Sequence, residues 1–334
     1  MQSEKYSRDN AGQSLKKYIL LKQGELAYNH GASKAKQFGC CYELTEPEAR
    51  IPYVYHCFKI NEDEYTPYVA MALNNAKMDQ QLKRLVSSSV RMDGLLNISF
   101  EDYMSVTLHL PSFIEQKHIA DFLTKLDERI AYQERLITSL KKYKRGLLNL
   151  VFSSKKSSWT KKRIGEFCNI TMGQSPDSNS YNSDCVGVPL VQGNADITDG
   201  VTTPLRYTSQ PTKVCKKGSI LLSVRAPVGT VCIADREVCL GRGVCAINSE
   251  NNAFVRQLFL YLEPSWKTIE QGGTFTAISR NDIANVEVTI PNDAAEQKRI
   301  GEHLGLIDLH ISQEVRMLQS IMSTKLGLMQ QLFI

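Results

Sequence analysis

The chain has 334 residues, of which 42% are hydrophobic and 22% charged, and a net charge of +5. This length exceeds what one hydrophobic core usually holds, so we expect at least two domains. No apolar run approaches the ~18 residues that cross a bilayer, and the polar start is unlike a signal peptide, which predicts a cytosolic protein without a membrane partner. The nine cysteines lack CxxC and zinc spacing, so free thiols are expected.

Residues 1–113 are expected to form a first mixed domain. The segment 22–26, Lys-Gln-Gly-Glu-Leu, predicts a turn that feeds a strand and is similar to Lys-Lys-Gly-Ser-Ile at 216–220. Further matches recur at one constant spacing along the chain: Ile98 with Ile278, Asp102 with Asp282, Val106 with Val286 and Pro111 with Pro291. Residues 157–214 have no counterpart before Leu20, so we expect this first domain to be incomplete at its N-terminus.

Residues 114–152 predict a long helix of coiled-coil type. Apolar residues recur at alternating spacings of three and four over about four heptads, as in a helix that faces another helix. The expected seam residues are Leu123, Leu126, Ile130, Gln133, Ile137 and Leu140. A polar seam residue such as Gln133 lowers stability but fixes the register and the partner.

A Ser/Lys linker at 153–158 leads to a second mixed domain at 159–291. We expect strands at 159–170, 188–191, 218–224, 230–234 and 286–290, and a helix at 253–262. Polar, glycine-rich segments separate these short strands. This pattern is typical of an α+β domain that presents loops.

The first helix has a copy in residues 292–334. Glu-Gln-Lys at 296–298 repeats Glu-Gln-Lys at 115–117, and the same offset continues without a gap to Phe152 and Phe333. The second seam is Leu304, Ile307, Ile311, Glu314, Leu318 and Ile321. Both seams are polar at the same step, which predicts antiparallel helices with Gln133 opposite Glu314. The alternative is that each helix packs only on its own domain.

The sequence lacks recognisable catalytic motifs. It has no Walker A loop, no GxGxxG after a strand, no Asn-Pro-Pro-Tyr-like tetrapeptide and no metal spacing among its six histidines. We therefore expect neither a catalytic nor a metal site. A carboxylate pair for metal-dependent cleavage is left open, and with it an enzyme whose site lies in the second domain.

Basic residues are clustered although the net charge is small. Clusters lie at 141–145, 155–156, 161–163 and 213–217. Such clusters can neutralise phosphates. Each one alone is also typical of a solvated helix end or linker, and it is their recurrence around both mixed domains that favours nucleic-acid binding.

Together these motifs resemble the DNA specificity subunits of type I restriction–modification systems. The stretch from Leu110-Pro111 to Phe152 is similar to the central conserved region of that family, and the stretch from Ile290-Pro291 to Phe333 to its distal one. Loops similar to those of its target recognition domains lie at 173–176, 192–197, 222–229 and 241–243. The resemblance covers nearly the whole chain. It implies an α+β fold with two mixed α/β target recognition domains, separated by two long antiparallel coiled-coil helices in a pseudo-two-fold internal repeat.

The resemblance also implies the function and the partners. Each domain would read one half of a bipartite site in double-stranded DNA, with the helices as spacer. Two modification subunits would methylate adenine with S-adenosylmethionine, and restriction subunits would cleave with ATP and Mg, so no cofactor is expected on this chain. The incomplete first domain makes another specificity-subunit fragment a further expected partner. The alternatives are a coiled-coil adaptor between proteins and a degenerate specificity subunit without specific DNA reading.

Candidate DNA contacts are polar residues of the loops. Arg and Gln can make bidentate contacts to bases, worth about 1–3 kcal/mol each, and Lys can contact phosphate. In the second domain the candidates are Gln174, Ser175, Tyr181, Asn194, Arg225, Thr274, Thr276 and Arg280 for bases, and Lys216 and Lys217 for phosphate. In the first domain they are Asn29, His30, Lys34 and Arg91. The alternative for Arg225 is that it only builds a turn.

Overall fold

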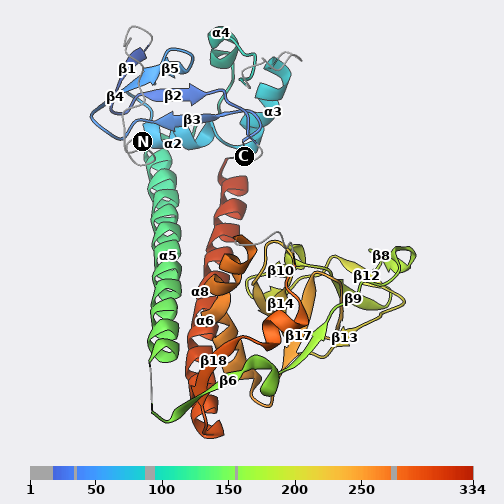
Figure 1. Cartoon of the computed structure of the whole chain (residues 1–334). Coiled ribbons are helices and arrows are strands. Elements are labelled where there is room, and N and C mark those ends of the chain that lie inside the picture. Colours follow the sequence, from blue (N-terminus) through green and yellow to red (C-terminus); the bar gives the residue numbers. More distant parts are fainter. Residues whose placement is uncertain (1–17, 34–35, 87–94, 155–156, 272–276, 334) are drawn as a thin grey trace. The chain divides into compact units, whose positions relative to one another are not determined.

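The computed structural model describes residues 18–33, 36–86, 95–154, 157–271 and 277–333. The chain divides into two compact units, Met1–Tyr132 with Leu318–Ile334, and Gln133–Met317. Each unit contains one mixed domain and one end of each long helix, α5 (Phe113–Ser153) and α8 (Ala294–Leu332) (Figure 1). Domain 1 is the part of the first unit that precedes α5, and domain 2 is the part of the second unit between α5 and α8. In the described part of the chain, no helix has the length and apolar character to cross a membrane.

In the second unit, the last part of α5 packs against the first part of α8. The Gln133 amide donates to the backbone carbonyl of Glu314 at 3.2 Å and also to its carboxylate. Lys144, further along α5, donates to Asp308, which lies earlier on α8. Residue numbers therefore rise along one helix as they fall along the other, so the pairing is antiparallel, with Gln133 against Glu314 as the sequence predicts.

In the first unit, the first part of α5 packs against the last part of α8 in the same sense. Lys325 on α8 donates to Asp127 on α5. The offset of 181 residues that relates Gln133 to Glu314 also relates Lys144 to Lys325 and Asp127 to Asp308. The helix pair therefore contains the same ion pair twice. The predicted fold class is confirmed: an α+β protein with long antiparallel coiled-coil helices and an internal repeat.

The described residues of domain 2 form short strands, which lie in three sheets, and two α-helices. The strands are β6 (Trp159–Arg163), β7 (Asn169–Met172), β8 (Tyr181–Asn182), β9 (Val188–Val191), β10 (Ile197–Thr198), β11 (Val201–Thr202), β12 (Arg206–Thr208), β13 (Val214–Cys215), β14 (Ile220–Ser223), β15 (Val231–Ile233), β16 (Val238–Leu240), β17 (Val244–Asn248) and β18 (Glu287–Pro291). The helices are α6 (Asn252–Gln271) and α7 (Arg280–Ala284). The sheets have the orders β10-β11-β15-β14-β17-β7, β13-β16-β9-β12-β8 and β18-β6.

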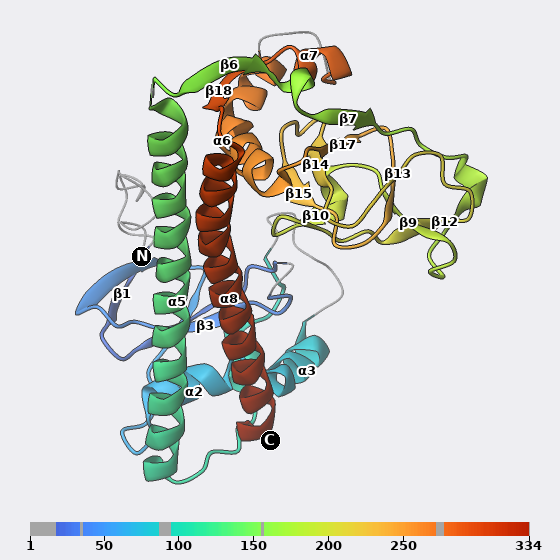
Figure 2. The same cartoon turned by 90° about the horizontal axis from the view of Figure 1, so that it is seen from below.

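The six-stranded sheet lies at the core of domain 2. Its strand β14 runs between β15 and β17 and is buried at all of its residues, which explains the apolar run Ile220–Leu222. The helix α6 lies alongside α8 in Figures 1 and 2. A side chain at Gly301 of α8 would lie 2.6 Å from the Phe254 nitrogen of α6, so the absence of a side chain there permits this close approach.

Two predicted elements of domain 2 differ from the structure. The single opening strand over 159–170 is wrong, because β6 and β7 belong to different sheets and a 3-10 helix at Ile164–Glu166 separates them. A side chain at Gly165 would lie 3.0 Å from the Ala284 side chain, so the chain turns closely over α7 at this point. The helix predicted at 253–262 continues to Gln271.

Within its described residues, domain 1 has fewer strands than domain 2. They are β1 (Tyr18–Lys22), β2 (Leu26–Asn29), β3 (Cys40–Glu43), β4 (Glu48–Pro52) and β5 (His56–Phe58), with helices α2 (Thr66–Ala72), α3 (Ala76–Leu85) and α4 (Phe100–Met104). The sheets are β3-β2-β5 and β1-β4. Leu26 and Tyr28 of β2 are buried against Val69 and Met78 of the helices, which forms the core of this domain.

The described strands of domain 1 repeat a contiguous part of domain 2. Gly24 and Gly218 both have a φ near +80°, which favours glycine, and each donates its N–H to an equivalent carbonyl, Leu44 at 2.9 Å and Ala234 at 2.8 Å. The predicted similarity of 22–26 to 216–220 is thus a shared turn. This turn aligns the strands β1 to β5, in order, with the strands β13 to β17. The pairs β1–β4, β2–β3 and β2–β5 are antiparallel, as are the aligned pairs β13–β16, β14–β15 and β14–β17.

The cysteines carry free thiols, as the sequence predicts. Most are buried, and Cys185 is exposed. Burial raises the pKa of Cys168 and of Cys232 to about 12, so these thiols stay protonated and unreactive near neutral pH.

Candidate nucleic-acid interface

Loops of domain 2 converge at one end of its two larger sheets. They follow β7 (173–176), β9 (192–196) and β14 (224–230), and one connects β16 to β17 (241–243). Together they enclose a cavity of ≈ 290 Å³. Its lining residues are Ser175, Gln192, Gly193, Asn194, Arg225, Ala226, Arg242 and Gly243.

Glycines allow the backbones of these loops to touch. A side chain at Gly243 would lie 2.1 Å from the Gln192 carbonyl oxygen, and one at Gly173 would lie 2.1 Å from the Gly241 carbonyl oxygen. Neither neighbour can move aside, because both are backbone atoms. The glycines therefore determine how closely the loops approach and, through this, the shape of the cavity.

Hydrogen bonds between the loops hold the same arrangement. The Gly241 N–H donates to the Val191 carbonyl at 2.8 Å, and the Arg242 N–H donates to the Ser175 hydroxyl at 3.1 Å. Arg225 is fixed by a backbone bridge to Ala277. The loop backbones are thus anchored, while the ends of the long side chains remain exposed.

The chemistry of the cavity is basic and polar. The side chains of Arg225 and Arg242 are exposed, and none of the described residues that line the cavity is acidic. Gln192 and Asn194 add amide groups, which both donate and accept hydrogen bonds. Guanidinium and amide groups together can bind the acceptor-rich edges of bases or a phosphate.

The structure brings together three of the predicted contacts, Ser175, Asn194 and Arg225. Gln174 is exposed beside Ser175. Two lining residues, Gln192 and Arg242, were absent from the predicted contacts. The sequence signal was present, since both belong to segments that resemble recognition loops.

Other predicted contacts lie elsewhere or outside the described residues. The Tyr181 hydroxyl donates to the Pro176 carbonyl at 3.1 Å, so it braces the loop after β7. The Arg280 Nε donates to the Ile170 carbonyl at 3.3 Å, and its side chain lines a separate hollow. Thr274 and Thr276 are outside the described residues.

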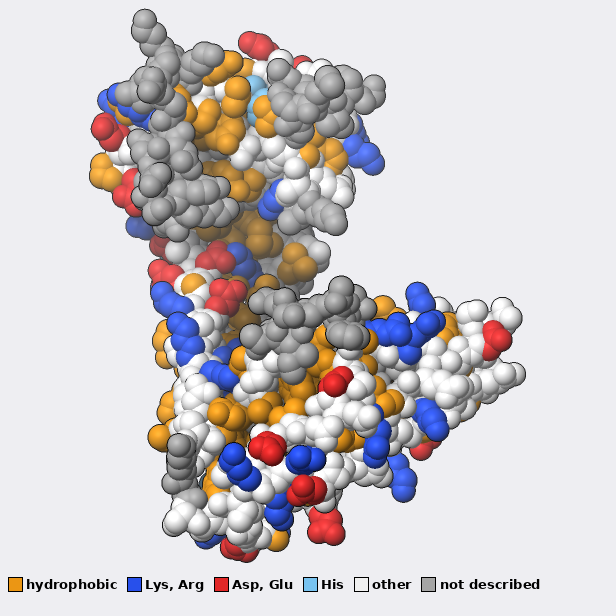
Figure 3. Space-filling model, in the orientation of Figure 1, with side chains coloured by type: hydrophobic (Ala, Val, Ile, Leu, Met, Phe, Trp, Pro, Cys, Tyr) orange, Lys and Arg blue, Asp and Glu red, His pale blue; other side chains and the backbone are white. Residues whose placement is uncertain are grey.

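The predicted phosphate contacts lie away from the cavity. Lys216 and Lys217 precede β14, whereas Arg225 follows it. Four strand residues separate the two ends by roughly 13 Å. Figure 3 shows several Lys and Arg side chains, with Asp and Glu among them, on one face of the second unit.

In domain 1, the predicted contacts that the structure describes have other roles. Asn29 accepts a hydrogen bond from the Gly31 N–H at 2.9 Å, so its side chain shapes the turn after β2. His30 is only 3% exposed, and within the described part of the chain neither ring nitrogen has a hydrogen-bond partner. A buried imidazole cannot contact DNA without a local change in structure. Lys34 and Arg91 are outside the described residues.

Metal binding has no structural support in the part of the chain that is described. No group of three or more His, Cys, Asp or Glu side chains converges there in a way that could hold an ion.

Known proteins with similar sequences indicate the family of this chain. Residues 156–319 match the family model for the type I restriction modification DNA specificity domain. A protein of Methanocaldococcus jannaschii, provisionally named the type I restriction enzyme MjaX specificity subunit, is 32% identical over 270 residues, which cover 74% of this chain. The chain spans 63% of the length of that relative.

Two solved structures share the fold. A chain from a type I restriction–modification system has a TM-score of 0.63 at 23% identity, with 97% of this chain and 84% of the other covered. The type I restriction–modification S subunit from M. genitalium has a TM-score of 0.63 at 16% identity, with 98% and 86% covered. The family model, the relative and the shared fold agree, and the chain belongs to the family of type I restriction–modification DNA specificity subunits.

Proposed function

We propose that this chain is a non-catalytic, sequence-specific DNA-recognition subunit, and that domain 2 reads bases with its loop cavity. The observation that carries the proposal is the convergence of Arg225, Arg242 and Gln192 from separate loops on one cavity, whose described lining contains no acidic residue. Family membership supplies the class of ligand, and the cavity supplies the chemistry. The chain would act in the cytoplasm, where the DNA of a prokaryotic cell lies.

In the proposed mode of recognition, side chains form hydrogen bonds directly with the edges of bases. An Arg side chain can donate two hydrogen bonds to the O6 and N7 atoms of guanine, and a Gln side chain can bond both N6 and N7 of adenine. Because the loops are tied by backbone contacts, the backbones at Arg225 and Arg242 need little ordering on binding. Each correct contact should therefore discriminate against a wrong base by about 1–3 kcal/mol.

The wider complex is part of the proposal. Two modification subunits would methylate adenine using S-adenosylmethionine, and restriction subunits would cleave using ATP and Mg, so the cofactors would reside on the partners. The two helices, α5 with 41 residues and α8 with 39, would serve as the spacer of a bipartite site. At 1.5 Å per residue each spans about 60 Å, which exceeds one ~34 Å turn of B-DNA.

The proposal is tested by selecting DNA sequences with the chain co-purified with its modification subunits. The variants Arg225→Ala and Arg242→Ala should each relax the preference at particular base positions and bind random DNA about as well as the parent chain. The matched control is Arg236→Ala, because Arg236 is also exposed but follows β15 at the far end of the sheet and pairs with Asp235. The control should leave the selected sequence unchanged.

Two outcomes would overturn the proposal. If the parent complex selects no sequence at about 150 mM salt, the coiled-coil adaptor becomes the better explanation, since non-specific binding weakens steeply with salt. If all three arginine variants lose preference equally, the cavity is not the reading site.

A further inference from the structure

We infer that Arg145 of α5 is a positioning residue for base reading by domain 2, because it holds the second half of α6 and, through it, the loop 224–230 that carries Arg225. This role rests on the proposed function and deepens it, since it concerns how the loop cavity keeps its shape. Arg145 itself is not among the described residues that line the cavity. The contacts that connect Arg145 to the loop lie wholly within the second unit.

The first observation is a proline inside α6. Pro264 lies in the second half of this helix. Because proline has no N–H, the carbonyl of Leu260, four residues earlier, cannot receive its usual hydrogen bond within the helix. The proline ring also presses on this carbonyl, and prolines in helix interiors bend the helix at such points. The direction of α6 beyond Pro264 therefore depends on how the carbonyls before it are held.

The second observation is that Arg145 donates to these carbonyls. Its Nη1 donates to the Leu260 carbonyl at 2.8 Å, and its Nη2 donates to the Tyr261 carbonyl at 3.2 Å. A guanidinium group is planar and rigid, so it can bind two neighbouring acceptors at once, and hydrogen bonds from a charged donor are stronger than neutral ones. Arg145 is partly buried, which reduces competition from water. The long helix α5 thus holds α6 at the point where α6 lacks a bond of its own.

The third observation is that the part of α6 after Pro264 packs on the loop 224–230. Trp266 is 1% exposed and lies in the same buried cluster as Val228. A side chain at Gly229 would lie 2.7 Å from the Cβ atom of Trp266, and Gly229 has a φ of +92°, which favours glycine. Because only a hydrogen atom fits between Gly229 and Trp266, a shift of α6 beyond Pro264 would displace the loop.

The chain returns to the same loop after α6. The Ile278 N–H donates to the Val224 carbonyl at 2.8 Å, and Ala277 forms a backbone bridge with Arg225. The connection from α6 to Ala277, residues 272–276, is outside the described residues. The end of α6 therefore acts on the loop through Trp266, and the segment that follows α6 holds the backbone of Arg225.

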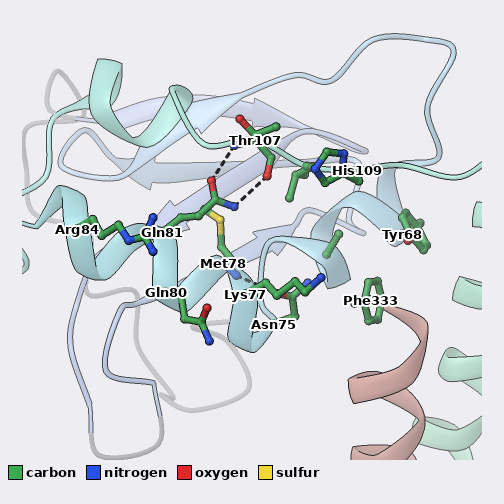
Figure 4. Close-up of a pocket in the computed structure, with 12 residues that line it drawn as sticks. Tyr68, Asn75, Lys77, Met78, Gln80, Gln81, Arg84, Thr107, His109 and Phe333 are labelled. Carbon is green, nitrogen blue, oxygen red and sulfur yellow. Dashed lines mark hydrogen bonds between the residues drawn. The ribbon is translucent and has the colours of Figure 1, made fainter.

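The internal repeat shows what stands at this place in domain 1. Tyr68 contacts Phe333 with ring centroids 5.3 Å apart, as Phe254 contacts Phe152 at 5.7 Å, and Figure 4 shows Tyr68 and Phe333. These equivalent contacts relate Tyr68 to Phe254. At the same spacing along the chain, α2 begins where α6 begins and α3 ends where α6 ends. The pair α2 and α3 is thus the counterpart of α6.

Domain 1 compensates for its helix break from within. Residues 73–75 separate α2 from α3, and there the Asn74 side chain donates to a carbonyl of α2 at 2.8 Å while Asn75 caps the start of α3. The copy of Arg145 in the helix repeat is Leu326, whose side chain has no donor. Only domain 2 takes its compensating group from a long helix, within the described part of the chain.

The first experiment selects DNA sequences with the chain co-purified with its modification subunits. Arg145→Ala should weaken the preference at the base position that depends on Arg225 by at least about threefold, a part of the roughly 5- to 150-fold that a bidentate contact gives. Arg145→Lys keeps a charged donor for one carbonyl and should lie between Arg145→Ala and the parent. The matched control is Arg135→Ala, which removes an exposed arginine of the same helix and should leave the selected sequence unchanged.

A double-mutant cycle separates positioning from a general loss of stability. In the Arg225→Ala chain, Arg145→Ala should change the preference at that position by less than about twofold, because the side chain that it positions is gone. In the Arg242→Ala chain its effect should remain in full. An equal loss of preference at every base position in both backgrounds would make Arg145 a structural residue only and would overturn the inference.

Hydrogen exchange on the full chain without DNA tests the link itself. In Arg145→Ala the amides of Gly229 and Ile278 should lose protection, whereas those of β14 should keep it. Equal loss in β14, or none at Gly229 and Ile278, would contradict the link. If the complex selects no DNA sequence while this local loss is seen, the proposed function fails and the link stands. If DNA is selected and Arg145→Ala changes neither measurement, only the inference fails.

Discussion

At the residue scale, the loop cavity of domain 2 depends on the absence of side chains as much as on their presence. Gly243 and Gly193 both line the cavity, yet their surroundings differ. A side chain at Gly243 would lie 2.1 Å from a backbone oxygen, whereas nothing lies within 4 Å of one at Gly193. Neither glycine has a φ in the left-handed region, so the difference between them is steric.

Gly243→Ala should therefore separate the loops, whereas Gly193→Ala should be tolerated. We expect Gly243→Ala to destabilise domain 2 by about 1–3 kcal/mol, as overpacking does, and to weaken specific DNA binding. Gly193→Ala should stay within about 0.5 kcal/mol of the parent. Chemical denaturation and a DNA-binding assay measure both. Similar stability of the two variants would contradict the steric role of Gly243.

The sequence predicted this site only in part. Ser175, Asn194 and Arg225 were predictable because polar residues in glycine-rich segments are typical of recognition loops. Gln192 and Arg242 lie in segments of the same kind, but that these two side chains line the cavity depends on backbone contacts between loops that are far apart in sequence. The distance of Lys216 and Lys217 from the cavity depends on the direction of β14, which residue type does not reveal.

At the scale of elements, the repeated ion pairs of the long helices differ in their surroundings. Asp308 accepts hydrogen bonds from Lys144 and from Arg256 and Gln257 of α6. Its copy, Asp127, accepts one from Lys325 and is 52% exposed. Burial lowers the pKa of Lys144, although the carboxylate of Asp308 opposes this shift. Removing one partner should therefore cost more unfolding free energy in the Lys144–Asp308 pair than in the Lys325–Asp127 pair.

Asp308→Ala and Asp127→Ala form a matched test of this difference. Removing Asp308 leaves Lys144 and Arg256 close together without their counter-charge, which should cost about 3–5 kcal/mol of unfolding free energy. Removing Asp127 should cost at most about 1 kcal/mol, because exposed ion pairs contribute little. Thermal or urea unfolding of the full chain gives both values, and a cost for Asp127→Ala as large as that for Asp308→Ala would disprove the argument.

Elements differ in how well the sequence predicts them. The long helices were predictable because an apolar spacing held over four heptads has few structural alternatives. The strands β10, β11 and β13 have two residues each, too few to show alternation, and they were missed. The 3-10 helix at Ile164–Glu166 was missed because it results from close packing on α7.

At the scale of the whole molecule, the two domains repeat one plan with different side chains. Residues 159–291 of domain 2 contain no histidine, whereas domain 1 places His30 and His56 with ring centroids 5.0 Å apart. Burial lowers the pKa of His56, and its Nε2 lies 3.2 Å from the Ile98 carbonyl oxygen. The folded domain therefore favours the neutral imidazole, whereas the unfolded chain titrates at the ordinary pKa.

Domain 1 should consequently lose stability at mildly acidic pH. Because the pKa of His56 is lower in the folded state, the unfolded chain takes up a proton first as the pH falls through about 6.5, and stability present above this pH is lost below it. Hydrogen exchange at about pH 7.5 and about pH 5.5, corrected for intrinsic rates, should show weaker protection of β2 but unchanged protection of β14.

His56→Gln is the control for this prediction, because Gln keeps a donor for the Ile98 carbonyl but does not titrate. The acid-dependent loss of protection in β2 should be smaller in this variant. An equal loss in the variant would assign the effect to other groups, such as Glu101, whose charge also acts on His56.

The antiparallel pair of β6 and β18 makes domain 2 interchangeable. The chain enters the domain through β6 and leaves it through β18, so entry and exit are adjacent, with Trp159 opposite Pro291. A recombination event that replaced everything between these two strands would leave the ends of both long helices where they are. Genetic exchange within this segment can thus replace the proposed DNA-reading domain in one step, without any change to the long helices that flank it.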